Sequence, residues 1–180
     1  MDRREKKMID THDEFVERAL AEYESPLIGY AVGFLHDADK ARDVVQDTFI
    51  RLYQQDIAKV RDGLKTWLFT VCRNRALDVL RKEKRMVALK DEKLEKMPTR
   101  EENPLEMADW DERVAQVHKA LARLSENQRE VIRLKFEQDL SYKEISEITG
   151  LSSGNVGFIL HVGLKKMRTL LPADLLTLKS

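Results

Sequence analysis

The sequence contains very little of what disulfide-rich, metal-binding or membrane proteins need. Its 180 residues include a single cysteine, Cys72, which excludes an internal disulfide and a cysteine-rich zinc site. Glycine and proline are scarce, with 7 and 4 residues, which argues against a many-stranded β-sandwich and for long helices. No apolar run approaches the roughly 20 residues that a membrane span needs, and no secretory signal is visible. We therefore expect a soluble, cytoplasmic, mostly α-helical protein.

An excess of charge of one sign is also missing, because 32 basic residues balance 32 acidic ones. Affinity for a polyanion would then require charge that is segregated along the chain. Residues 73–90 hold seven basic and two acidic residues, whereas residues 91–112 hold nine acidic and three basic ones. The acidic stretch also contains Pro98 and Pro104 and has weak apolar periodicity. We expect an acidic linker over residues 87–112, with small helical domains over 10–86 and 113–175.

Apolar periodicity predicts four helices in the first domain, over about residues 13–24, 26–35, 39–54 and 66–84. Ser25 is interpreted as an N-cap, with Pro26 in the first turn of the second helix, where its missing N–H costs nothing. Residues 56–63 are expected to form a loop.

The helix expected over residues 66–84 has two different faces. An apolar stripe that must face the core contains Phe69, Cys72, Ala76, Val79 and Leu80. The opposite face contains Trp67, Thr70, Asn74, Asp78, Arg81 and Arg85, with Arg75 and Lys82 flanking. Stacking on an aromatic ring contributes about 1–3 kcal/mol per base, and cations neutralise phosphates, so this face suits an opened DNA strand. The alternative is that Trp67 packs on the earlier helices and the arginines are merely solvated.

The second domain contains two capping boxes, Ser125-Glu126-Asn127-Gln128 and Ser141-Tyr142-Lys143-Glu144. They predict helices over about residues 126–137 and 142–149, followed by a turn at Gly150 and a longer helix over about 153–171. Two helices joined in this way form a helix-turn-helix, whose second helix enters the major groove of DNA. Other helical corners imitate the pattern, so by itself it leaves DNA binding open.

Three motifs in order resemble those of extracytoplasmic-function (ECF) sigma factors, the small two-domain specificity subunits of bacterial RNA polymerase. Residues 65–82 (KTWLFTVCRNRALDVLRK) resemble the promoter-melting and recognition helix, and residues 39–49 (DKARDVVQDTF) resemble the polymerase-binding segment. Residues 124–131 (LSENQREV) and 140–145 (LSYKEI) resemble the carboxy-terminal helix-turn-helix. The resemblance implies an all-α fold with a four-helix promoter-melting domain and a helix-turn-helix domain joined by the acidic linker. It also implies a sigma factor that binds core RNA polymerase, recognises minus-ten and minus-thirty-five promoter elements and promotes DNA opening.

The resemblance assigns roles to three groups of residues. The expected polymerase contacts are Asp43, Gln46, Asp47, Phe49 and Ile50. The expected minus-ten contacts are Trp67, Asn74, Arg75, Arg81, Lys82, Lys84 and Arg85, with Asn74 at a base edge and the last four cations at phosphates. The expected minus-thirty-five contacts are Ser152, Ser153, Asn155, Phe158, His161 and Lys165. The implied partners are core RNA polymerase and promoter DNA, and the resemblance permits a cognate anti-sigma factor; no cofactor is implied.

Several features limit or complicate these assignments. The family usually has basic residues at the positions of Gly157 and Ile159, so we expect weaker cationic contact with the duplex and an unusual minus-thirty-five preference. The acidic linker is either an inert spacer or a segment that imitates phosphates in a polymerase channel. The four histidines lack the spacing of a metal site, and no phosphate loop or nucleophile motif is visible, so we expect no metal and no enzyme activity. The alternative function is a stand-alone helix-turn-helix repressor or activator, which leaves the helix over 66–84 unexplained.

Overall fold

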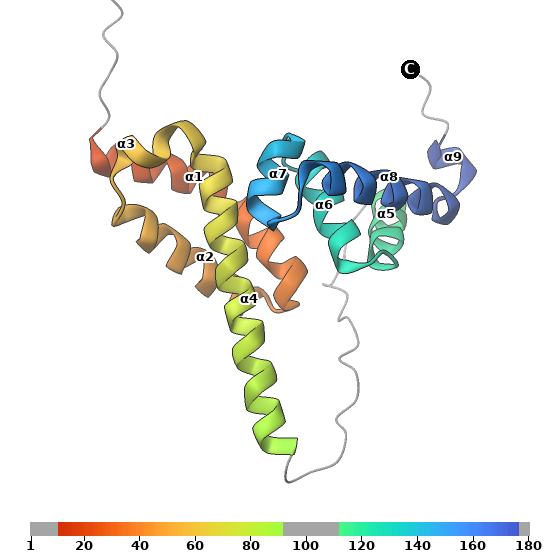
Figure 1. The fold of residues 1–180 in the computed structure, drawn as a ribbon, viewed down its shortest axis with the longest axis horizontal. Coiled ribbons are helices and arrows are strands. Elements are labelled where there is room, and N and C mark those ends of the chain that lie inside the picture. Colours follow the sequence, from red (N-terminus) through yellow and green to blue (C-terminus); the bar gives the residue numbers. More distant parts are fainter. Residues whose placement is uncertain (1–10, 92–111, 177–180) are drawn as a thin grey trace, which may run out of the picture. The chain divides into compact units, whose positions relative to one another are not determined.

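In a computed structural model of the chain, residues 11–91 and 112–176 are described, and all regular secondary structure within them is helical. The chain divides into two compact units, Met1–Lys96 and Met97–Ser180. Figure 1 shows the helices of both units. The first unit contains α1 (His12–Leu35), α2 (Ala38–Tyr53), α3 (Ile57–Val60), a 3-10 turn η1 (Arg61–Gly63) and α4 (Leu64–Asp91). The second contains α5 (Glu112–Ala122), α6 (Glu126–Phe136), α7 (Tyr142–Thr149), α8 (Ser153–Leu170) and α9 (Ala173–Leu176). The prediction of an all-α fold is confirmed.

Helix α1 continues through Pro26 without interruption, so the prediction of two helices that meet at Ser25 and Pro26 is wrong. Proline removes one hydrogen bond inside a helix and crowds the preceding turn. The helix nevertheless continues because its buried face keeps one register on both sides of the proline. The residues of this face are separated by multiples of four positions: Phe15, Ala19, Leu27, Ala31 and Leu35. Their joint burial against α2 and α4 outweighs the local loss.

The core of the first unit lies where α1, α2 and α4 pack against one another. Leu27 and Phe69 are fully buried, and the ring of Tyr30 lies 5.1 Å from that of Phe69, measured between centroids. The Cys72 thiol lies in the same contact, with its Sγ 3.9 Å from the carbonyl oxygen of Leu27. Burial raises the pKa of Cys72 to about 12, against a smaller lowering by the Thr48 hydroxyl. The thiol therefore behaves as a small core residue.

Residues 56–63, expected as a loop, form α3 and η1 instead. The Asp56 side chain caps α3 by accepting a hydrogen bond of 3.1 Å from the backbone N–H of Ala58, and Val60 is buried. Helix α4 then continues through Asp91, five residues into the segment expected as linker, because Met86 to Asp91 include no glycine or proline. Its last turns project beyond α1 and α2 (Figure 1). The rest of the expected linker lies outside the described residues.

The second unit contains the expected helix-turn-helix, formed by α7 and α8 with α6 packed against both. Both capping boxes are present: the backbone N–H groups of Gln128 and Glu144 donate to the hydroxyls of Ser125 and Ser141, and the Gln128 and Glu144 side chains accept in return. Gly150 ends α7 with a φ of 75°, a left-handed conformation that favours glycine. Five fully buried side chains hold the three helices together: Val131, Leu134, Leu140, Ile145 and Val156.

Candidate nucleic-acid interface

One side of α4 carries most of the residues expected to contact an opened DNA strand. Asn74, Arg81 and Arg85 are exposed, and Trp67 is half-buried. Spacings of seven and four residues place these side chains along one stripe of the helix. The opposite side of α4 is buried, with Leu68, Phe69, Cys72 and Ala76 in the core, whereas Val79 and Leu80 are only half-buried. The amphipathic pattern read from the sequence therefore describes the orientation of α4 correctly.

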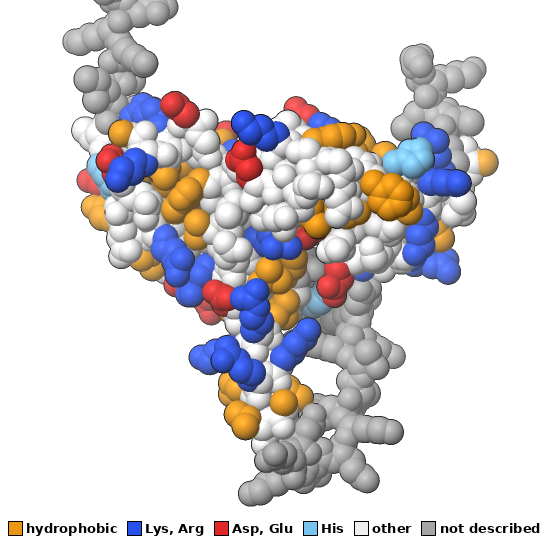
Figure 2. Space-filling view, viewed as in Figure 1, with side chains coloured by type: hydrophobic (Ala, Val, Ile, Leu, Met, Phe, Trp, Pro, Cys, Tyr) orange, Lys and Arg blue, Asp and Glu red, His pale blue; other side chains and the backbone are white. Residues whose placement is uncertain are grey.

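Cations cluster on the projecting half of α4. Lys82, Lys84 and Arg85 are exposed there, and Figure 2 shows Lys and Arg side chains gathered along this part of the helix. Arg81 lies among them but is already engaged, because its Nη1 atom donates to Oδ1 of Asp78 at 2.9 Å. Both side chains of that pair are more than half exposed, so the pair is weak and exchanges readily with solvent or phosphate.

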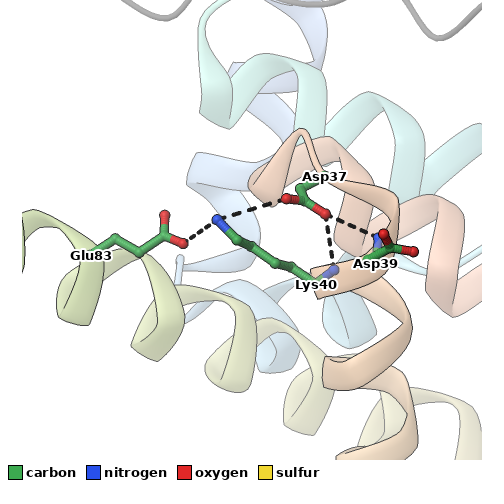
Figure 3. Close-up of polar contacts among 4 residues, drawn as sticks. All are labelled: Asp37, Asp39, Lys40 and Glu83. Atoms are coloured by element: carbon green, nitrogen blue, oxygen red, sulfur yellow. Dashed lines mark hydrogen bonds and ion pairs between the residues drawn. The ribbon is translucent and has the colours of Figure 1, made fainter. Parts of the chain in front are cut away.

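A lysine from another helix neutralises the carboxylate within this cluster. Lys40, in the first turn of α2, pairs with Glu83 of α4, and its Nζ atom also lies 3.8 Å from Oδ2 of Asp37 (Figure 3). Asp37 is the N-cap of α2, and its side chain accepts hydrogen bonds from the backbone N–H groups of Asp39 at 3.0 Å and Lys40 at 3.1 Å. The Lys40–Glu83 pair thereby joins the start of α2 to α4.

Arg75 is held by a second link between the same two helices. Its Nη2 atom donates to Oδ2 of Asp47 on α2, and the two side chains are 32% and 44% exposed. The Nε atom of Arg75 is buried and has no hydrogen-bond partner. This residue therefore differs from Asn74, because it faces α2 and not only solvent.

The residues expected to contact polymerase lie on α2, but one of them is in the core. Asp43, Gln46 and Ile50 are exposed, and Asp47 is partly exposed. The exposed fraction of Ile50 is 51%, so this residue adds an apolar side chain to the exposed side of α2. Phe49 is 7% exposed because it lies four residues after Val45 and therefore on the buried side of the helix. Its ring packs inside the unit, and the exposed surface consists of the other four residues.

The residues expected at the minus-thirty-five element are all exposed at α8 or its N-cap: Ser152, Ser153, Asn155, Phe158, His161 and Lys165. The Ser152 hydroxyl is the N-cap and accepts from the backbone N–H of Asn155 at 3.2 Å. Phe158 is 66% exposed and contrasts with Val156 and Leu160, which are buried on the other side of the helix. The exposed side of α8 contains no Lys, Arg, Asp or Glu from residue 152 to 164, and its first lysine is Lys165.

Two glycines of α8 lie close to side chains of neighbouring helices. A Cβ atom at Gly157 would lie 3.3 Å from Cε2 of Tyr142, so the start of α7 lies close against this turn of α8. A Cβ atom at Gly163 would lie 2.9 Å from Cδ1 of Ile132 on α6. Ile159, the other departure from the basic pattern, is half-buried. These positions contribute to the packing of the second unit.

Sequence reasoning did not identify Lys40, Glu83 or Tyr142 as part of these surfaces. The two members of the Lys40–Glu83 pair are 43 positions apart, so no local pattern connects them. Within the described residues, no group of three or more His, Cys, Asp or Glu side chains could hold a metal ion. In the same part of the chain, no helix has the length and apolarity to cross a membrane.

Comparison with known proteins assigns both units to one kind of protein. Residues 20–86 match the family described as Sigma-70 region 2, and residues 115–167 match Sigma-70, region 4. RNA polymerase sigma factor SigV of Bacillus subtilis is 31% identical over 140 residues, which cover 77% of this chain and 80% of that protein. ECF RNA polymerase sigma factor RpoE of Cereibacter sphaeroides is 28% identical over 162 residues, or 88% of each chain.

A solved structure is similar as well. It contains the sigma factor RpoE in complex with the anti-sigma factor NepR from Bartonella quintana. The match has a TM-score of 0.63 and 27% identity, and it covers 88% of this chain and 97% of the other. One matched region lies in each compact unit, and most of α4 and of α8 lies within them.

Proposed function

Since this chain belongs to the ECF family of sigma-70 sigma factors, we propose that α4 binds the minus-ten element as an opened strand and that α8 binds the minus-thirty-five element. The chain is a sigma factor of RNA polymerase with region 2 and region 4 domains, and the family is non-enzymatic. The proposed domains are residues 10–86 and 113–175. The acidic segment between them is proposed to occupy a positively charged channel of the polymerase by imitating phosphates.

The observation that carries the minus-ten proposal is the exposed stripe of α4. Trp67 is half-buried, so its indole is partly accessible for stacking of an extruded base. Asn74 lies seven residues further on the same stripe and offers an amide donor and acceptor to a base edge. Arg81 and Arg85 continue the stripe, and Lys82 and Lys84 flank it, so phosphates of the same strand meet cations. Base flipping costs a few kcal/mol, and these contacts would offset that cost.

Polymerase binding is proposed for the exposed side of α2, formed by Asp43, Gln46, Asp47 and Ile50. The supporting observation is that a half-exposed isoleucine lies beside two carboxylates on the side of α2 that faces away from the core of the unit. An apolar residue flanked by carboxylates is complementary to a helix of a larger subunit that carries basic side chains around an apolar contact. Phe49 is left out of the contact because its ring is buried.

We further propose a cognate anti-sigma factor as a partner and the cytoplasm as the location. The support for the first is the similar solved structure from Bartonella quintana, which contains a sigma factor in complex with an anti-sigma factor. The support for the second is the family, whose members act on RNA polymerase and DNA.

Transcription in vitro with core RNA polymerase and a fragmented genomic template tests the promoter proposal and yields the promoter sequences. Adding the chain to the core enzyme is expected to produce sequence-specific strand opening that weakens with salt. Asn74→Ala is expected to reduce opening roughly 5- to 150-fold, because it removes a base-edge interaction of about 1–3 kcal/mol, with little change in polymerase binding. Asn127→Ala, an exposed asparagine of α6, is the matched control. Equal loss of opening and of polymerase binding in Asn74→Ala would count against the base contact.

A further inference from the structure

Two of the proposed contact residues, Asp47 and Arg75, form an ion pair with each other. Asp47 belongs to the proposed polymerase surface of α2, and Arg75 belongs to the proposed minus-ten group of α4. The Arg75 guanidinium donates to the Asp47 carboxylate across the contact between the two helices. The pair is thus shared by the two surfaces and belongs wholly to neither.

The positions of the two residues explain how both surfaces reach one ion pair. Asp43, Asp47 and Ile50 are four and three residues apart, so they lie on one side of α2. Arg75 lies next to Asn74 on α4 and seven residues before Lys82. Asp47 is 44% exposed and Arg75 32% exposed, so an incoming partner can reach both side chains.

We propose that this ion pair couples polymerase binding to DNA binding. In the free chain Asp47 holds Arg75 and opposes a nearby phosphate by its own negative charge. When a basic group of the polymerase engages Asp47, the Arg75 guanidinium becomes available to a phosphate of the opened strand. This inference rests on the proposed function, because it takes Asp47 as a polymerase contact and Arg75 as a DNA contact.

The physical basis is competition for one charge. When the carboxylate accepts a hydrogen bond from a polymerase group, its interaction with the guanidinium becomes weaker. When the guanidinium binds a phosphate, its interaction with the carboxylate becomes weaker in the same way. Coupling between two sites is reciprocal, so the same factor applies to DNA affinity and to polymerase affinity. A partly exposed pair limits that factor to about fivefold. The Arg75 Nε atom is buried and has no hydrogen-bond partner, which raises the free energy of the paired arrangement. Arg75 therefore leaves Asp47 more easily.

Binding of the full-length free chain to a fluorescein-labelled oligonucleotide of twenty thymidines tests whether Asp47 keeps Arg75 from binding phosphate. Fluorescence anisotropy at low salt is expected to give Asp47→Asn a roughly two- to fivefold higher affinity than the unchanged chain. Arg75→Gln is expected to lower the affinity, and the double variant is expected to match Arg75→Gln. An unchanged affinity of Asp47→Asn, or the same gain in the Arg75→Gln background, would overturn the proposal.

Asp39→Asn is the matched control, because it also removes one negative charge from α2. Asp39 pairs with Arg42 on its own helix at 2.9 Å and has no part in either proposed contact. Asp39→Asn also releases Arg42, so a gain in affinity for the oligonucleotide equal to that of Asp47→Asn would mean that the lost negative charge or a released arginine of α2, and not release of Arg75, is responsible. Circular dichroism melts of the three single variants show whether each remains folded.

Binding of labelled chain to core RNA polymerase, without DNA, tests the other half of the coupling. Arg75→Gln is expected to raise the affinity for the core enzyme by up to about fivefold, since nothing then competes for Asp47. An unchanged or reduced affinity would overturn the coupling. Failure of the unchanged chain to bind the core enzyme would instead contradict the proposed function, and the oligonucleotide measurement, which contains no polymerase, keeps the two failures distinct.

Discussion

Replacing Phe158 with alanine should weaken the sequence-specific binding of α8 to the minus-thirty-five duplex while leaving the fold intact. Phe158 projects from the exposed side of α8, between Asn155 and His161, where the helix carries no cation. An apolar ring in this place can contact the methyl group of thymine in the major groove. The contribution of this contact can be estimated from the surface that the ring exposes.

A fully covered phenylalanine buries about 150–250 Å². Since 66% of Phe158 is exposed, roughly 130 Å² remains available, which at about 25 cal/mol per Å² limits the contact to about 3 kcal/mol. A groove covers only one side of a ring, so about half of this, or roughly 1.5 kcal/mol, is the expected loss. That corresponds to roughly tenfold weaker binding.

Holoenzyme binding to a promoter obtained by transcription in vitro is the appropriate assay, with each thymine of the minus-thirty-five element replaced in turn by uracil. Loss of one methyl group should weaken binding by the unchanged protein but not by Phe158→Ala. Phe136→Ala is the matched control, because Phe136 is 61% exposed at the end of α6, outside the recognition helix. The reasoning is refuted if the same uracil penalty persists without the Phe158 ring, or if Phe136→Ala weakens binding as much.

Three further predictions concern polymerase binding, packing and the thiol. Asp43→Lys should weaken binding to core RNA polymerase roughly tenfold by placing like charges together, whereas Glu17→Lys, an exposed position of α1, should not; equal effects would remove Asp43 from the contact. Gly163→Val should lower the free energy of unfolding by about 1–3 kcal/mol through overpacking, since even its Cβ would lie 2.9 Å from Ile132 Cδ1. Gly154→Ala, with nothing within 4 Å of the added atom, should raise this free energy by about 0.5–1 kcal/mol, and urea unfolding that shows no difference between the two would contradict the packing. Burial raises the pKa of Cys72 from 9.0 to about 12, so the protonated thiol stabilises the fold below pH 9 and that contribution is lost as the pH rises toward 12. A disulfide reagent at pH 8 should therefore modify Cys72 only after unfolding, and rapid reaction of the folded chain would contradict the burial.

Features that depend on neighbouring residues could be predicted from the sequence. The capping boxes at Ser125 and Ser141 form as expected because donor and acceptor are only three residues apart. The exposed stripe of α4 was predictable for a similar reason, since a helix with a buried side at Phe69 and Cys72 must turn Asn74 outward. Such patterns need no knowledge of the partner helices.

Features that depend on packing between distant segments were missed. Pro26 indicated a helix start, but the continuous stripe buried against α2 and α4 keeps α1 in one piece. Phe49 was missed for another reason: it fitted a family motif for polymerase contact, although its position four residues after the buried Val45 already places it on the buried side of α2. The Arg75–Asp47 ion pair joins residues 28 positions apart, and the periodicity of each helix does not predict which residues of two helices meet.

The carboxylates at the α4 surface are neutralised in different ways, and the difference affects how many cations DNA can use. Asp78 engages Arg81 and Asp47 engages Arg75, so each occupies a cation of the surface itself. Glu83 is engaged by Lys40 of α2, which leaves the cations of α4 around it for phosphates. In Lys40→Met, Glu83 should turn toward these cations and pair with them, which weakens binding to single-stranded DNA. The slope of log affinity against log salt should become less steep by about 0.7 for each phosphate that is no longer neutralised. Glu83→Gln in the Lys40→Met background should restore the slope, because no carboxylate then competes; a slope that stays low would show that Lys40 acts on DNA by its own charge.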